Sequence, residues 1–375
     1  METKMYYSYV MGIDDSILEL KNQGFVIEND NENYTVSFPE NKANIWEAFI
    51  TKKLELGYWN EYLADDKVVF LFQMEDGIKR YEVYDFKNDE VLALCEKLCE
   101  CKMESHEKML SENHYYKKVM ADRIKRANQT YWNEHADLWF GTTALPTLGV
   151  LFPTEEELHL FGDVAGKRML EICCGSGHSL KYNAKRGAAE LWGVDISQKQ
   201  LENASAYLKE NGYSANLICS PMEADMDIPK EYFDIVYSIY GIGWTTDLQG
   251  TFDRIASYLK KGGIFIFSWH HTLNYCVGWS FDDRKDVLGE DGSLVFHKSY
   301  FDESYFKMPV HDSEIVLCNR KISTYINALA KAGFVVEQMI EQTDDATMAA
   351  EGNITDKEKK AKMVPISFCI KARKL

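Results

Sequence analysis

The stretch Met169-Leu-Glu-Ile-Cys-Cys-Gly-Ser-Gly-His178 decides the fold of this chain. A short apolar run passes an acidic residue, reaches the turn Gly175-x-Gly177 and continues into a segment with a helical pattern. Glycine adopts positive φ angles without strain and lets a ligand approach the backbone closely. The helix that follows offers unpaired N–H groups at its N-terminus. The stretch therefore predicts a strand, a ligand-binding turn and a helix in succession.

The pattern after this turn predicts a parallel sheet. Short apolar runs alternate with segments of helical periodicity, which is typical of βαβ units. Strands are predicted over residues 168–173, 191–194, 216–219, 233–239, 263–268, 334–340 and 364–371. Helices are predicted over residues 197–211, 248–259 and 324–332. We therefore expect an α/β fold for the C-terminal two-thirds of the chain.

Residues 1–110 predict a separate and smaller α+β domain. Two hairpins are expected, from residues 25–28 with 34–38 and from residues 68–74 with 80–86. Helices are expected over residues 14–24, 41–56 and 89–101. This domain contains no catalytic motif, so binding, dimerisation, substrate presentation and a purely structural role all stay open.

The charge of the chain argues against a nucleic-acid partner. Its 375 residues include 42 Lys and Arg against 59 Asp and Glu, a formal net charge of −17. Residues 1–110 hold 12 basic and 23 acidic residues, a net charge of −11, which leaves −6 for the remainder. Phosphate backbones are bound mainly by basic side chains. The acidic N-terminal domain suits a basic peptide partner, and a homodimer formed through it is the other option.

The sequence favours a cytoplasmic protein without membrane segments. The longest strongly apolar runs, such as residues 263–269, fall far short of the ~18 residues that a membrane helix needs. The N-terminus lacks the apolar core of an export signal. Nine cysteines at irregular spacing fit reduced thiols better than a disulfide framework.

An acidic residue ends the second predicted strand, 18 residues after Gly177. Asp195 is well placed there to accept hydrogen bonds from both hydroxyls of a ribose. A dinucleotide fingerprint would have a third small residue where Leu180 stands. Glu171 would repel a phosphate but attract a cationic amino-acid end, such as the ammonium of S-adenosylmethionine (SAM). SAM is therefore preferred over NAD as the cofactor.

In these motifs, residues from about 128 to 375 resemble class I SAM-dependent methyltransferases related to those of ubiquinone and menaquinone biosynthesis. The stretches that carry the resemblance are residues 170–177, 193–197, 233–238 and 259–265. The resemblance implies a Rossmann-like, seven-stranded sheet in the order 3-2-1-4-5-7-6, with strand seven antiparallel. Residues 1–110 fall outside it.

The resemblance also implies a set of cofactor contacts. These are Glu171, Gly175 and Gly177 for the methionine part, Asp195 for the ribose, Ile196, Met222 and Glu223 for the adenine, and Ser238 to Tyr240 for the sulfonium. Cys173 stands where the family usually has glycine, and its side chain tightens the turn.

The catalytic requirements of methyl transfer are modest. Transfer from a sulfonium is an in-line displacement, so the protein mainly aligns the reactants and excludes water. An oxygen or nitrogen acceptor can need a base, usually histidine. His270 and His271 follow the fifth predicted strand and are candidates for a base or a substrate anchor, with helix capping or packing as the competing interpretation. Tyr240 is a further catalytic candidate, and Tyr240 and Trp244 are alternative substrate contacts.

Two segments are expected to cover the cofactor. Residues 111–150 predict a helical linker and a lid that contains Trp132 and Trp139. The methyltransferase domain is assigned to residues 151–375, with an aromatic cap inserted at about 269–320. The aromatic residues of the cap are Trp269, Tyr275, Trp279, Phe281, Phe296, Tyr300, Phe301, Tyr305 and Phe306. Such rings suit a flat or apolar substrate or pack the core of the cap. Trp139 and Tyr300 are substrate-contact candidates.

Two clusters have the composition of a metal site but fit other roles better. Cys95, Cys99 and Cys101, near His106 and His114, follow an apolar helical stripe rather than zinc spacing. The second cluster consists of His270, His271, His297 and His311. We therefore expect no metal.

The sequence thus predicts a SAM-dependent methyltransferase that acts on a small molecule through an oxygen, nitrogen, carbon or sulfur acceptor. Two alternatives stay open. One is a peptide or protein methyltransferase that recruits its substrate through residues 1–110, and the other is a SAM-binding module without catalysis. An NAD-dependent enzyme ranks third.

Overall fold

The chain divides into two compact units, Met1–Arg123 and Ile124–Leu375. The computed structural model describes residues 2–9, 20–29, 33–39, 42, 45, 59–64, 67–73, 79–85, 114–277, 287–310 and 313–375. The division between the units falls inside the segment 111–150, for which the sequence predicts a linker. None of the helices in the described residues is both long and apolar enough to cross a membrane.

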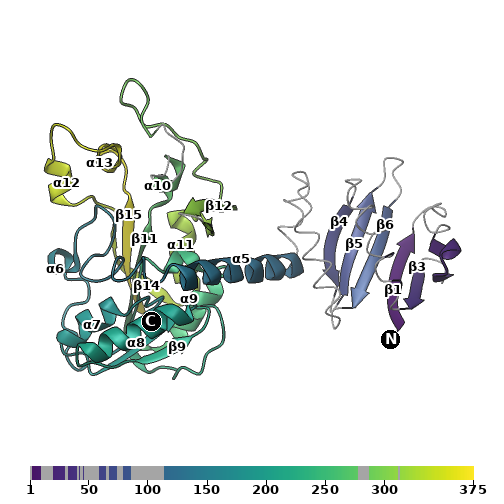
Figure 1. Cartoon of the computed structure of the whole chain (residues 1–375), viewed down its shortest axis with the longest axis horizontal. Coiled ribbons are helices and arrows are strands. Elements are labelled where there is room, and N and C mark those ends of the chain that lie inside the picture. The colour runs from purple at the N-terminus through teal and green to yellow at the C-terminus, as the bar shows by residue number, and fades with distance from the viewer. Residues whose placement is uncertain are drawn as a thin grey trace. The chain divides into compact units, whose positions relative to one another are not determined.

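The N-terminal unit contains a six-stranded antiparallel sheet in the order β2-β3-β1-β6-β5-β4 (Figure 1). Its strands are β1 (Glu2–Tyr9), β2 (Val26–Asn29), β3 (Asn33–Pro39), β4 (Trp59–Ala64), β5 (Lys67–Gln73) and β6 (Lys79–Asp85). Both predicted hairpins are confirmed, since β2 pairs with β3 and β5 pairs with β6. Of the helix predicted over residues 14–24, the structure describes residues 20–24, and residues 20–22 are helical. The helices predicted over residues 41–56 and 89–101 lie outside the described residues except for residues 42 and 45.

Strands β1 and β4 of this sheet were not predicted from the sequence. β1 pairs with both β3 and β6, so it joins the two hairpins into one sheet. Its sequence alternates Thr3, Met5 and Tyr7 with Glu2 and Lys4. An alternation with a period of two residues is typical of a strand, so the sequence did contain a signal for β1.

The C-terminal unit is built on a seven-stranded sheet in the order β14-β15-β11-β10-β7-β8-β9. Its strands are β7 (Arg168–Ile172), β8 (Glu190–Asp195), β9 (Asn216–Cys219), β10 (Phe233–Ile239), β11 (Leu259–His270), β14 (Phe334–Ile340) and β15 (Ser367–Lys374). Numbered along the chain and read from β9, this order is 3-2-1-4-5-7-6. β15 runs antiparallel to both of its neighbours, and the other pairs are parallel. The Rossmann-like α/β fold is therefore confirmed.

Helices precede, connect and flank these strands (Figure 1). The longer ones are α5 (His114–Glu134), α7 (His178–Lys185), α8 (Gln198–Glu210), α9 (Leu248–Tyr258) and α11 (Ile322–Lys331). The shorter ones are α6 (Glu155–Leu158), the 3-10 turn η2 (Ile242–Trp244), α10 (Thr272–Cys276), α12 (Asp345–Ala349) and α13 (Asp356–Ala361). The helices predicted over residues 197–211, 248–259 and 324–332 correspond to α8, α9 and α11.

Alternation along the strands produces two separate hydrophobic cores. On β11, Phe265 and Phe267 face one core, which also holds buried side chains of α9 and α11. Ile266 faces the other core, which holds Leu180 of α7 and Leu201 of α8. Successive side chains of a strand point to opposite faces, so a sheet covered on both faces needs apolar residues at nearly every strand position.

The cap begins later than the sequence predicts. β11 extends to His270, so Trp269 belongs to the strand and is buried in the core. Beyond it the cap contains α10 and a hairpin of β12 (Tyr305–Val310) and β13 (Ser313–Cys318). Trp279 and Phe281 lie outside the described residues. Phe301 is 80% exposed, so at least this ring does not pack a core.

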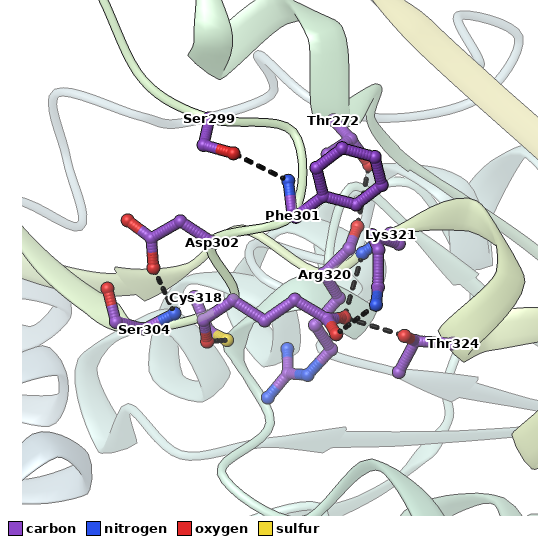
Figure 2. A network of polar contacts seen from close by, with 10 residues as sticks. Thr272, Ser299, Phe301, Asp302, Ser304, Cys318, Arg320, Lys321 and Thr324 are labelled. Atoms are coloured by element: carbon purple, nitrogen blue, oxygen red, sulfur yellow. Dashed lines mark hydrogen bonds and ion pairs between the residues drawn. The ribbon is translucent and has the colours of Figure 1, made fainter. Parts of the chain in front are cut away.

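Polar contacts anchor the cap to the rest of the unit (Figure 2). The carboxylate of Glu303 accepts hydrogen bonds from the Lys321 N–H at 2.9 Å and from the Thr324 hydroxyl at 2.6 Å. The Thr272 hydroxyl donates to the carbonyl oxygen of Arg320 at 2.6 Å. These contacts tie the loop before β12 and the start of α10 to the N-terminal end of α11.

Replacing Phe368 by alanine tests the packing of β15. Phe368 is fully buried in an interior strand, and truncating such a ring costs about 3–5 kcal/mol. We expect Phe368→Ala to lower the free energy of unfolding by that amount in urea denaturation. Val335→Ala on the edge strand β14 is the control, because Val335 is 46% exposed and surface changes usually cost within about 0.5 kcal/mol. Equal losses in the two variants would contradict the assigned position of β15.

Candidate active site

A cavity with about 720 Å³ of empty space, open solvent included, lies where β7, β8, β9 and β10 end. Ligands of open α/β sheets bind at this edge. Its lining residues are Lys125, Asn128, Trp132, Thr143, Cys173, Gly175, Val194, Asp195, Ile196, Gln200, Ser220, Pro221, Met222, Glu223, Ile239, Tyr240 and Trp244. Most of the predicted cofactor contacts are among them, whereas Glu171, Gly177 and Ser238 are not.

The turn after β7 has left-handed backbone at three residues. The φ angles are 59° at Cys173, 49° at Gly175 and 77° at Gly177. A cysteine in this region is strained, because only glycine adopts it freely. Space for the cysteine side chain comes from Gly241, where an added Cβ would lie 2.5 Å from the Cys173 Cβ. The cysteine that replaces the family's usual glycine is thus matched by a glycine in the loop after β10.

Asp195 connects this turn to the end of β8. One carboxylate oxygen accepts a hydrogen bond from the Gly175 N–H, and the other accepts one from the Ser197 N–H, both at 2.9 Å. Burial raises the pKa of Asp195 to about 6. Each carboxylate oxygen has a further lone pair, so a carboxylate held in this way can also accept from two neighbouring hydroxyls, as the ribose prediction requires.

Glu171 lies beneath the turn rather than in the cavity wall. Strand alternation places it on the α7 side of the sheet, where it is 2% exposed and accepts a hydrogen bond from the Tyr237 hydroxyl at 3.4 Å. Burial raises the pKa of Glu171 well above its usual value. The side chain of Glu171 is thus enclosed in this structure, and its contact with the methionine part stays a prediction.

Tyr240 contributes its ring to the cavity wall, but its hydroxyl is held by the protein. The hydroxyl accepts a hydrogen bond from the Val150 N–H at 2.9 Å and pairs with the Ser367 hydroxyl. Burial raises the pKa of Tyr240 to about 12. These contacts suit a wall residue, and a catalytic role of Tyr240 stays a prediction.

Trp244 is held in place by a buried arginine. The guanidinium of Arg320 donates hydrogen bonds to the carbonyl oxygens of Gly243 and Thr245, on either side of the tryptophan. The Trp244 ring packs edge-on against Trp132, with 5.3 Å between ring centroids. Tyr240, Trp132 and Trp244 all line the cavity, and the substrate contact of Trp244 stays a prediction.

The cavity also carries the residues predicted for adenine. Ile196, Met222 and Glu223 all line it. The Glu223 carboxylate accepts hydrogen bonds from the N–H and the hydroxyl of Thr246, at 2.6 and 2.7 Å. An apolar slot beside a fixed carboxylate can take a flat ring that bears an amino group.

Neither predicted histidine is among the residues that line the cavity. The His270 ring packs edge-on against Tyr240 at 4.5 Å, and burial lowers the pKa of His270 to about 3. His271 caps α10, since its Nδ1 accepts from the Leu273 N–H at 3.1 Å, and its Nε2 bonds to Glu341 at 2.7 Å. With both ring nitrogens of His271 engaged, the competing interpretation of a capping residue describes it better than a catalytic base.

The remaining predicted contacts lie around the cavity. An added Cβ on Gly177 would lie 3.0 Å from the Ala204 Cβ, so this glycine lets α7 pack closely on α8. Ser238 is fully buried. Tyr300 is half-buried against Phe301 and is not among the lining residues. Trp139 lines a second cavity, with about 330 Å³ of empty space including open solvent, that shares Thr143, Cys173, Gly175 and Gln200 with the first.

Several lining residues were not predicted. Lys125 and Asn128 precede Trp132 on α5 at helical spacing, so one helix face meets the cavity. This spacing is the signal that could have identified them. Gln200, in the first turn of α8, lines both cavities. It lies five residues after Asp195, and this short separation from a predicted cofactor contact could have identified it.

The two clusters considered for metal fall partly outside the described residues, which lack Cys95, Cys99, Cys101 and His311. Within the part of the chain that the structure describes, no group of three or more His, Cys, Asp and Glu side chains is placed to hold a metal ion.

Comparison with known families agrees with this geometry. Residues 170–267 match a family described as the methyltransferase domain. The matched stretch includes the glycine turn, Asp195, Glu223 and Tyr240. This part of the chain is a methyltransferase domain. The expected enzyme class is confirmed, and SAM is the cofactor of this methyltransferase domain.

Individual relatives resemble the chain over different lengths. An uncharacterized protein from Haemophilus influenzae is 27% identical over 225 residues, which are 58% of this chain and 85% of the relative. A ubiquinone biosynthesis O-methyltransferase from a Shewanella species is 30% identical over 30% of this chain and 46% of the relative. A sterol 24-C-methyltransferase from Aspergillus fumigatus is 31% identical over 31% of this chain and 32% of the relative. The chain thus matches less than half the length of these two methyltransferases.

A solved SAM-dependent methyltransferase from Mesorhizobium loti is 23% identical, with a TM-score of 0.47. The match covers 60% of this chain and 100% of that one.

The raised pKa of Asp195 predicts pH-dependent cofactor binding to the methyltransferase domain. Because that pKa is about 6, the carboxylate forms above pH 6 and takes up a proton below it. We expect the Kd for S-adenosylhomocysteine to rise about tenfold from pH 7 to pH 5, measured by calorimetry. Asp195→Asn should bind more weakly and with little pH dependence. A flat profile for the unmodified protein would contradict the ribose assignment.

The close approach of Cys173 and Gly241 predicts that Cys173→Gly reduces the stability cost of Gly241→Ala. Gly241→Ala places a Cβ too close to the Cys173 side chain, and overpacking of this kind costs about 1–3 kcal/mol. In the Cys173→Gly background the same change should cost less, because one of its two close obstacles is gone, whereas the Ser238 Oγ, 2.6 Å from the added Cβ, remains. A double-mutant cycle in urea denaturation measures the difference. Strict additivity would show that the two residues do not constrain each other.

Proposed function

We propose that this chain transfers a methyl group from SAM to a small-molecule acceptor bound in the 720 Å³ cavity. The observation that carries the proposal is that two sets of residues line one cavity. The first set is Gly175, Asp195 and Ile196, which suit an adenosine, and the second set is the aromatic residues Trp132, Tyr240 and Trp244. Aromatic residues in the cavity of a cofactor suit a flat or apolar acceptor.

The first set of residues fits SAM. Asp195 offers carboxylate lone pairs to a ribose, and Ile196 and Met222 offer an apolar surface to an adenine. A Cβ added to Gly175 would have the Gln200 Oε1, 3.9 Å away, as its nearest neighbouring atom. The side of Gly175 is therefore open, and a ligand can lie against the backbone there. Bound SAM would supply a methyl group on a sulfonium, which is a good leaving group.

The residues of the chain then act mainly by positioning. Asp195 would fix the adenosine, and the rings of Tyr240 and Trp244 would hold the acceptor and exclude water. Burial raises the pKa of the Cys173 thiol well above its usual value, so this thiol stays protonated and is not a nucleophile. Since the Tyr240 hydroxyl is engaged by Val150 and Ser367, we expect alignment to contribute more than proton abstraction.

The relatives support a small acceptor but do not choose its atom. One is named for ubiquinone biosynthesis and O-methylation, the other for methylation of a sterol at carbon. Since the chain matches less than half of each, the identity of the acceptor is not transferred from either. A cytoplasmic location stays a prediction.

One observation favours a second candidate. The N-terminal unit is acidic, with a net charge of −11 over residues 1–110, which suits capture of a basic peptide. The chain would then methylate a peptide or protein that this unit recruits. Self-association through the same unit would instead give a homodimer, and a SAM-binding module without catalysis would transfer no methyl group at all.

The fate of a labelled methyl group separates these candidates. The purified chain is incubated with methyl-labelled SAM and a cell extract, which is then divided into acid-precipitated protein and acid-soluble material. We expect label in the small-molecule fraction, and far less with Asp195→Ala. Label in precipitated protein would favour the peptide candidate. If the chain binds S-adenosylhomocysteine but transfers no label, the non-catalytic module would be favoured.

A further inference from the structure

The side chain of Gln200 has an unsatisfied acceptor at the centre of the site. Gln200 lies in the first turn of α8 and is 4% exposed. Its backbone N–H donates to the Ser197 hydroxyl at 3.1 Å, which fixes the start of the helix. Its Oε1 has no hydrogen-bond partner among the described residues. Buried polar atoms are nearly always hydrogen-bonded, so this oxygen points to a donor on a ligand.

The position of Gln200 shows which part of a ligand it meets. It lines both cavities, together with Thr143, Cys173 and Gly175. A Cβ added to Gly175 would lie 3.9 Å from the Gln200 Oε1. The oxygen therefore lies beside the glycine turn, where the two cavities meet.

The second cavity extends away from the predicted adenine contacts. Its lining residues are Trp139, Gly141, Thr142, Thr143, Ala144, Cys173, Cys174, Gly175, Ser176, His178 and Gln200. Ile196, Met222 and Glu223 line only the first cavity. A ligand whose nucleoside lies at Asp195 and Ile196 would therefore send its other end past Gly175 toward Gln200.

The residues at this end offer no carboxylate to a cation. The residues that line the second cavity include no aspartate or glutamate. Glu171, the acid of the glycine motif, is enclosed beneath the turn. The Ser176 hydroxyl accepts from the Gly141 N–H and contacts His178 Nδ1, both at 3.0 Å. Of the side chains in this wall, Gln200 thus presents the buried acceptor that is still available.

We propose that the amide oxygen of Gln200 accepts a hydrogen bond from the ammonium group at the methionyl end of SAM. This inference rests on the proposed function and assigns a binding residue to one group of the cofactor. It also explains how a positively charged end is received where the motif acid is enclosed. A neutral amide oxygen can accept from an ammonium without adding a buried charge.

Two ligands that differ only at this end test the proposal. S-Adenosylhomocysteine carries the amino-acid group, whereas 5′-methylthioadenosine shares the adenosine and the thioether but lacks it. Gln200→Leu keeps a similar volume and removes the acceptor. Its Kd for S-adenosylhomocysteine should rise about 10- to 100-fold, because hydrogen bonds to charged groups are among the stronger ones. Its Kd for 5′-methylthioadenosine should stay unchanged.

Further variants control for side effects. Gln198→Leu, on the same helix turn but exposed, should leave both dissociation constants unchanged. Gln200→Glu retains the acceptor and should bind S-adenosylhomocysteine at least as well as the unmodified chain. Circular dichroism and thermal melting check folding, and Gln200→Met replaces Gln200→Leu if the latter does not fold.

The outcomes separate this proposal from the proposed function. Equal weakening of both ligands would place Gln200 at the adenosine instead and overturn the assignment, as would unchanged binding of both. Failure of the unmodified chain to bind either ligand would overturn the proposed function itself. Selective loss of S-adenosylhomocysteine binding is the result that supports the role of Gln200.

Discussion

The site depends on the hydrogen bond between the Gly175 N–H and the carboxylate of Asp195. It joins the turn after β7 to the end of β8, two neighbouring parallel strands of the sheet. The same carboxylate accepts from the Ser197 N–H, so it also fixes the start of α8. Because α8 carries Gln200, the turn, the ribose acceptor and the buried amide are positioned by one carboxylate.

Contacts between distant segments close the rest of the cavity. The Tyr240 hydroxyl connects the end of β10 with Val150 and with Ser367. Arg320, at the start of α11, holds the turn that carries Trp244. Each wall of the cavity is thus fixed by residues that lie far from it in the sequence. Such enclosure suits a reaction that needs aligned reactants and little water.

The sheet and half of the site could be predicted because their signals are local. The glycine turn, Asp195 and the alternation of apolar runs with helices are each visible within a few residues. The roles of Glu171, His270 and His271 depended on which face of a strand or helix end each side chain occupies. Glu171 falls on the covered face of the sheet, and His271 is used by α10 and Glu341. Motif position alone could not reveal these tertiary contacts.

The roles of Gln200 and Gly241 also depend on tertiary contacts that motif position does not reveal. Gly241 leaves the space that the Cys173 side chain occupies. Glutamine in the first turn of a helix has no distinctive pattern, and its importance appears only once two cavities are seen to meet beside it. The strain at Cys173 is visible from the sequence as a missing glycine. Its compensation, 68 residues later in the chain, follows from the approach of two loops.

The place of β15 has a consequence for the order of assembly. Among the seven strands of this sheet it comes last along the chain, yet it pairs with both β11 and β14 in the interior of the sheet. A nascent chain that has not yet produced it exposes the unpaired edge of β11, and such an edge is prone to pair with other chains. Ser367, which helps to hold Tyr240, arrives with this strand. The hydrogen bonds that hold Tyr240 in the cavity wall are therefore complete only once β15 has joined the sheet.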